Sequence, residues 1–106
     1  MPFIDLNKIE PKQMIPGYKA KFIHSKNMTV SYWDTEAGYS LPEHSHPHEQ
    51  VTSIIQGQFE FTVDGETQTM GPGSVCIIPS NAKHKGTSIT DCKIIDVFYP
   101  VREDYK

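Results

Sequence analysis

Eight prolines, spread along the whole chain, divide it into pieces that suit strands better than helices. Proline removes a backbone donor and clashes with the preceding helical turn, so few segments can form an uninterrupted helix. Between the prolines lie runs rich in β-branched and aromatic residues, bounded by Gly, Pro and Asn, and such runs predict strands. The predicted strands cover residues 18–24, 29–35, 51–56, 58–63, 67–70, 75–78 and 93–99.

Residues 58–70 show the strand pattern most clearly. Phe59, Phe61 and Val63 alternate with polar residues, which is typical of a strand with one buried and one solvated face. The Asp64-Gly65 pair that follows favours a tight hairpin turn, because glycine tolerates positive φ. Many short strands with regular turns, in a chain of 106 residues, predict one all-β domain, either a sandwich or a closed barrel.

Charge and hydropathy exclude several classes of protein. The net charge is -3 and the ten Lys and Arg residues are scattered, so the basic stripe typical of nucleic-acid binding is missing. No apolar run approaches the roughly 20 residues that a membrane helix needs. The first residues, MPFIDLNKIEPKQ, lack the apolar segment of a secretory signal. We therefore expect a cytoplasmic protein with no nucleic-acid or membrane partner.

The segment HSHPHEQ, residues 44–50, concentrates three of the five histidines. Residues i and i+2 of a strand share a face, so His44 and His46 can converge on one ion at about 2.0–2.2 Å per bond. Gln50 keeps the same parity if the strand resumes, and its carbonyl oxygen is a possible neutral ligand. Glu49 has the opposite parity but is the rival carboxylate. The alternative is a solvated polar turn with no ion.

The residues around these histidines resemble the first motif of the cupin superfamily. Gly38, His44, His46 and Gly57 match that motif in register, and Gln50 stands where the motif has Glu. A second motif of the same superfamily is matched further along the chain, by Gly73, Pro79 and His84. Two positions of that second motif differ, with Asn81 at its second Gly and Ser88 at its final Asn.

The resemblance implies a single cupin domain over residues 1–106, an all-β barrel also described as a double-stranded β-helix or jelly roll. It also implies one divalent transition metal ion (Ni, Zn, Mn or Fe) bound by His44, His46, Gln50 and His84. His48 would then lie near the ion or at the rim of the site. Because all four ligands are neutral, the ion would keep its double charge and favour an anionic substrate.

The last part of the chain holds further candidate residues. Asp96 and Phe98 share parity and can face the same interior, where a carboxylate is costly unless it has a partner or a function. The alternative for Asp96 is a structural salt bridge. Arg102 can fold back over the mouth of the barrel, or it can be a surface arginine beside its acidic neighbours at 103–104.

The segments HPHEQ, GQFEF and DVFYPVRED are similar to those of the small cupins of pectin and alginate breakdown, which linearise unsaturated uronates. This similarity implies that Asp96 donates or accepts the proton, that Arg102 binds the substrate carboxylate, and that Phe98 lines the pocket. Two other functions stay open: a metal-dependent dioxygenase, and a sugar- or carboxylate-binding cupin without catalysis.

Residues 1–17 form an N-terminal arm that is more apolar than a free tail should be. Its apolar residues are Phe3, Ile4, Leu6, Ile9, Met14 and Ile15. We therefore expect this arm to take part in a homodimer contact.

Overall fold

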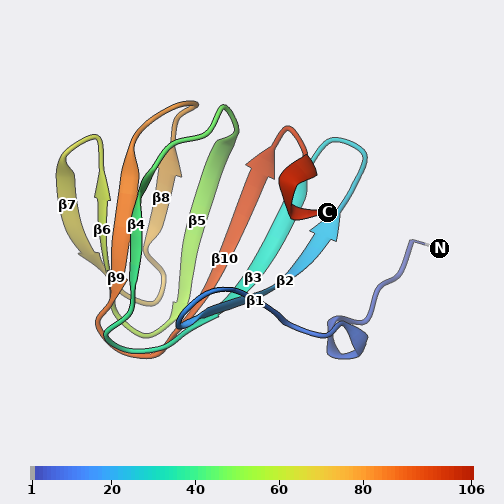
Figure 1. Ribbon diagram of the computed structural model, residues 1–106, viewed down its shortest axis with the longest axis horizontal. Coiled ribbons are helices and arrows are strands. Elements are labelled where there is room, and N and C mark those ends of the chain that lie inside the picture. Colours follow the sequence, from blue (N-terminus) through green and yellow to red (C-terminus); the bar gives the residue numbers. More distant parts are fainter. Residues whose placement is uncertain (1) are drawn as a thin grey trace.

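The computed structural model describes residues 2–106 as ten β-strands in two antiparallel sheets, which face each other (Figure 1). The larger sheet has the order β1-β2-β3-β10-β5-β8, and the smaller has the order β4-β9-β6-β7. The strands of the larger sheet are β1 (Lys12–Ile15), β2 (Tyr18–His24), β3 (Thr29–Thr35), β5 (Glu49–Gln56), β8 (Val75–Ile78) and β10 (Cys92–Tyr99). Those of the smaller are β4 (Ser40–His44), β6 (Phe59–Val63), β7 (Glu66–Met70) and β9 (His84–Ser88).

All seven predicted strands are present, and the predicted all-β class is confirmed. Three strands were not predicted: β1, β4 and β9. Two of them have low local strand propensity, because β4 contains Pro42 and β9 contains Gly86. Strand β4 is an edge strand, where proline is tolerated. At Gly86 the ring of Phe59 packs so closely that a Cβ would have no room.

The hairpin of β6 and β7 follows the sequence prediction. Asp64 and Gly65 have φ values of 49° and 80°, the left-handed geometry that a tight hairpin turn requires. Phe59 and Phe61 point inward and are 3% and 4% exposed. Each aromatic ring therefore contributes to the core that joins the two sheets.

The interior of the barrel changes character along its length. One part is an apolar cluster built from both sheets, including Tyr18, Ile54, Phe59, Met70 and Ile78. The other part buries polar and charged side chains, which is costly unless they have partners or a function. The buried polar residues used below are His46, Gln50, Thr52, His84, Asp96 and Arg102. The connections β4–β5 and β8–β9 lie at the same end of the barrel as the C-terminus (Figure 1).

Part of the predicted N-terminal arm, residues 1–17, is a strand of the larger sheet. Lys12–Ile15 pairs with β2 and extends the larger sheet, so the second half of residues 1–17 belongs to the domain. Met1 lies outside the described residues. Further along, Phe3 and Ile4 are 88% and 59% exposed. The only helices in residues 2–106 are two short 3-10 turns, η1 (Leu6–Lys8) and η2 (Glu103–Tyr105), neither of which has the length to cross a membrane.

Candidate functional site

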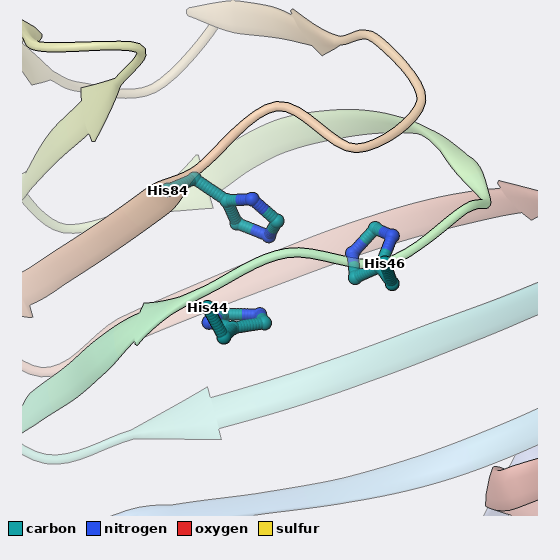
Figure 2. A group of neighbouring side chains, drawn as sticks. All are labelled: His44, His46 and His84. Carbon is teal, nitrogen blue, oxygen red and sulfur yellow. The ribbon is translucent and has the colours of Figure 1, made fainter.

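Three histidines from three places in the chain meet at the polar end of the barrel (Figure 2). His44 ends β4 and His84 begins β9, and the two are register partners. His46 lies in the loop between β4 and β5. Each of the three offers a nitrogen, and these nitrogens lie within 4.8 Å of one another. His44 and His46 converge as expected, but strand parity is not the reason. The strand ends at His44, and the loop after it brings His46 inward.

The hydrogen bonds of the three rings determine which nitrogen is available. In each ring Nδ1 lies near a backbone carbonyl two residues away, which can only accept, so Nδ1 carries the proton. The distances are 2.9 Å from His44 to Pro42, 3.0 Å from His46 to His48 and 2.9 Å from His84 to Ala82. Nε2 therefore keeps its lone pair, in the manner of a metal-binding histidine.

Burial keeps two of these rings neutral. It lowers the pKa of His84 to about 4, and the positive charge of Arg102 and the neighbouring histidines act in the same direction. Burial also lowers the pKa of His46, again with a contribution from Arg102. At neutral pH both rings are therefore unprotonated at Nε2, as a metal ligand must be.

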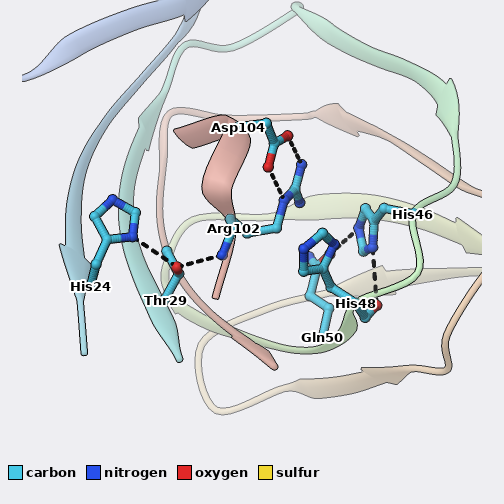
Figure 3. A network of polar contacts seen from close by, with 7 residues as sticks. All are labelled: His24, Thr29, His46, His48, Gln50, Arg102 and Asp104. Carbon is cyan, nitrogen blue, oxygen red and sulfur yellow. Dashed lines mark hydrogen bonds and ion pairs between the residues drawn. The ribbon is translucent and has the colours of Figure 1, made fainter. Parts of the chain in front are cut away.

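Gln50 completes the group from the inner face of β5, and its exposed fraction is 5%. Its Oε1 lies 3.0 Å from Nε2 of His46 (Figure 3), and its Nε2 donates to Thr52 Oγ1 at 2.9 Å. Thr52 in turn donates its single proton to Asp96 Oδ1 at 2.6 Å, so it must accept from the amide of Gln50. Two lone pairs, on His46 and Gln50, therefore face each other.

A cation between these atoms removes that repulsion, so the residues present fit a metal ion. Two ligand atoms bound to one ion at about 2.1 Å lie up to about 4.2 Å apart, so the three imidazoles need only a small movement to share one. Three imidazoles and an amide oxygen suit a divalent transition metal. Glu49, the rival carboxylate, is exposed and points away from the group, as its parity predicted.

Asp96 and Phe98 both point inward from β10, as predicted, and are 8% and 2% exposed. Burial raises the pKa of Asp96 to about 6, against the opposing effects of the hydrogen bond from Thr52 and the charge of Arg102. A carboxyl with this pKa holds or releases a proton near neutral pH. Asp96 has no salt bridge among the described residues, so the salt-bridge alternative is wrong.

Arg102 lines an interior cavity together with Asp96 and Phe98. It is 6% exposed, so the alternative of a surface arginine is wrong. Its Nε and Nη2 donate to the carboxylate of Asp104 at 3.0 and 2.7 Å (Figure 3). Its backbone N–H donates to Thr29 Oγ1 at 2.9 Å. The guanidinium carbon lies 3.9 Å from the ring centre of Tyr105 and 4.8 Å from that of Phe98. Nη1 is buried and has no partner within residues 2–106.

Comparisons with known proteins identify the family of this chain. Residues 31–98 match the family described as Cupin domain. The chain belongs to the cupin family. It is 26% identical over 92 residues to the pectin degradation protein KdgF of Dickeya dadantii, covering 84% of each chain. The solved structure of KdgF from Halomonas sp. superposes with a TM-score of 0.94 at 25% identity, covering 100% of this chain and 99% of that one.

A second relative of this cupin is named for a different activity, that of a dioxygenase. Acireductone dioxygenase of Bacillus thuringiensis is 27% identical over 86 residues, which are 76% of this chain but only 51% of the relative. The cupin domain thus spans about half of that longer protein. With the family and the fold established, the cupin barrel expected from the two motifs is confirmed.

Sequence reasoning did not place Thr52 or Tyr105 in this cupin's site, and it named Asp104 only as an acidic neighbour of a surface Arg102. Thr52 had a usable signal, because it shares strand parity with Gln50. Tyr105 had none, and nothing in the sequence separated Asp104 from Glu103, because the contacts with Arg102 depend on how the chain turns after β10.

The two remaining histidines, His48 and His24, lie outside the cluster of three. His48 is half-buried against Phe98, with ring centres 6.5 Å apart, and is not among the three clustered histidines. Its Nδ1 is buried and has no hydrogen-bond partner within the described part of the chain. His24 ends β2, and its Nδ1 lies 2.9 Å from Thr29 Oγ1, the hydroxyl that also accepts from the backbone N–H of Arg102 (Figure 3).

Proposed function

We propose that this cupin is a metal-dependent enzyme that opens the ring of 4,5-unsaturated uronates, giving the linear 4-deoxy-5-keto-uronate. The observation that carries the proposal is the lining of one cavity. A buried carboxyl with a pKa near neutrality, Asp96, and a buried guanidinium with a free donor, Arg102, line it together with His44, Gln50 and His84. The similarity to KdgF, named as a pectin degradation protein, supports the choice of substrate.

Arg102 is suited to hold the substrate carboxylate. Asp104 occupies Nε and one hydrogen of Nη2, so the free donors are those of Nη1 and the second hydrogen of Nη2. These form a planar pair that fits the two oxygens of a carboxylate. The rings of Phe98 and Tyr105 fix the plane of the guanidinium, which reduces the rotamer entropy lost on binding.

Asp96 is suited to move the proton. In the proposed isomerisation the C1 hydroxyl loses a proton, the bond from C1 to the ring oxygen breaks, and C4 gains a proton while C5 becomes a ketone. Atoms and electrons balance without a co-reactant. A bound divalent ion would supply Lewis-acid stabilisation of developing negative charge on oxygen. Asp96 can accept one proton and deliver another because its pKa is about 6.

The test follows the loss of ultraviolet absorbance from the conjugated double bond of unsaturated galacturonate. Metal-loaded parent protein should consume the substrate. Asp96→Asn should lower kcat by about 10²–10⁴, because a positioned acid–base group is removed. Arg102→Ala should mainly raise KM. Thr62→Val, in an exposed pair of threonine hydroxyls on β6 and β7, is the control and should match the parent. Parental rates in both site variants would contradict the proposal.

A dioxygenase is the second candidate, supported by the partial similarity to acireductone dioxygenase. Three histidines that leave coordination positions open on Fe(II) also suit O₂ chemistry. The two functions separate in an oxygen electrode. The isomerisation consumes no O₂, whereas a dioxygenase consumes one O₂ per turnover. Tight binding of uronates with neither turnover would instead indicate a binding protein.

A further inference from the structure

We propose that Thr52 is a positioning residue for the metal centre: its hydroxyl orients the amide of Gln50 so that the carbonyl oxygen, and not the NH₂ group, faces the histidines. This inference rests on the metal assignment made under the proposed function, but it does not depend on the substrate. The cupin motifs assign no role to this position, which lies among the unspecified residues between Gln50 and Gly57.

The geometry is a chain of hydrogen bonds through the interior. Thr52 is 2% exposed and stands two residues after Gln50 on the inner face of β5. Its hydroxyl accepts from Gln50 Nε2 at 2.9 Å and donates to Asp96 Oδ1 at 2.6 Å. Thr52 and Asp96 are also register partners on neighbouring strands, so the backbone holds the short bond in place.

The orientation matters because an amide has two unlike ends. The last torsion of a glutamine side chain has two broad preferences, which exchange the oxygen and the nitrogen. With the nitrogen toward His46, the amide would present hydrogens to the metal and one ligand would be lost. The Thr52 hydroxyl has one proton, which goes to the acceptor Asp96, so its remaining capacity is as an acceptor. It therefore selects the NH₂ group of Gln50.

A carboxylate ligand would not need such a residue. Glutamate has two equivalent oxygens, and either end can bind an ion. The replacement of the motif's Glu by Gln50 creates the need for orientation, and the hydroxyl two residues later meets it. The same hydroxyl links the ligand to Asp96, so that the metal centre and the proposed proton carrier keep a fixed spacing.

The experiment measures Co²⁺ binding to the full chain, because the visible spectrum of Co²⁺ reports its ligand set. Thr52→Val replaces the hydroxyl by a methyl group of similar size, and Thr52→Ala removes the hydroxyl and puts nothing in its place. Thr52→Ser keeps the hydroxyl. Loss of a group that orients a ligand typically weakens metal binding by about 10–100-fold. We expect that loss and a changed spectrum in the Val and Ala variants, and recovery of both in the Ser variant. Thr62→Val should behave as the parent.

Parental affinity and spectrum in either the Val or the Ala variant, each checked to be folded by its far-ultraviolet circular dichroism, would overturn the inference. So would equal losses in Thr52→Ser and Thr52→Val, which would indicate packing rather than hydroxyl chemistry. A parent that takes up no Co²⁺ would overturn it together with the metal assignment. Failure of uronate turnover alone, with the Co²⁺ results as expected, would reject the proposed substrate and leave this inference standing.

Discussion

Asp96 should make the folded protein less stable as the pH rises, and Asp96→Asn should remove that dependence. The unfolded carboxyl titrates near 3.8, whereas burial raises the pKa of folded Asp96 to about 6. Between these values the folded state binds more protons than the unfolded state. The stabilising contribution of the protonated carboxyl is therefore complete below pH 3.8 and is lost as the pH rises through 6.

The magnitude follows from the two pKa values. A shift of one unit corresponds to 1.36 kcal/mol, so ionising Asp96 in the folded state costs about 3 kcal/mol relative to the unfolded chain. The free energy of unfolding of Asp96→Asn minus that of the parent should therefore rise by about 3 kcal/mol from pH 3.5 to pH 7.5. Any constant difference caused by the amide itself does not affect this change.

The assay is urea unfolding of metal-free parent and Asp96→Asn at several pH values. The lowered pKa values of His46 and His84 give the opposite trend, since neutral buried histidines gain stability as the pH rises through their unfolded value of 6.5. Both proteins share that trend, so the difference between them isolates Asp96. A difference that stays flat within about 0.5 kcal/mol would refute the reasoning, because Asp96 would then titrate alike in both states.

Other variants test the remaining parts of the site and the assembly. His84→Ala should reduce bound metal from one ion per chain to a small fraction, measured by elemental analysis, and undiminished content would defeat its assignment as a ligand. Asp104→Asn should raise KM for unsaturated uronate about tenfold with little change in kcat, because the Arg102 fork loses the carboxylate that fixes it; an unchanged KM would show that the ring contacts suffice. Phe98→Ala should lower the free energy of unfolding by about 3–5 kcal/mol in urea titrations, as expected for a side chain that is 2% exposed; a loss below 1 kcal/mol would contradict its place in the core. Light scattering at micromolar concentration should give twice the 12.0 kDa chain mass if the apolar N-terminal residues contribute to a homodimer, and a monomer mass would count against it.

The sequence by itself determined the fold class and most of the elements. Alternation of apolar and polar residues, as at Phe59 and Phe61, is a local property with period two, so it can be read without knowing what lies opposite. The turn at Asp64 and Gly65 is equally local. The two spaced histidine motifs likewise indicated the cupin family before any contact was known.

Only the tertiary structure decided how the site is assembled. Strands β4 and β9 have weak local signals and are held by pairing, β9 with β6 and β4 with β9. The second pairing places His44 opposite His84. His46 joins them from a loop, for a reason that strand parity could not give. The hydrogen bonds that run from Gln50 through Thr52 to Asp96 depend on the pairing of β5 with β10, which places Thr52 opposite Asp96. Such relations join residues 44 positions apart, and a linear pattern does not contain them.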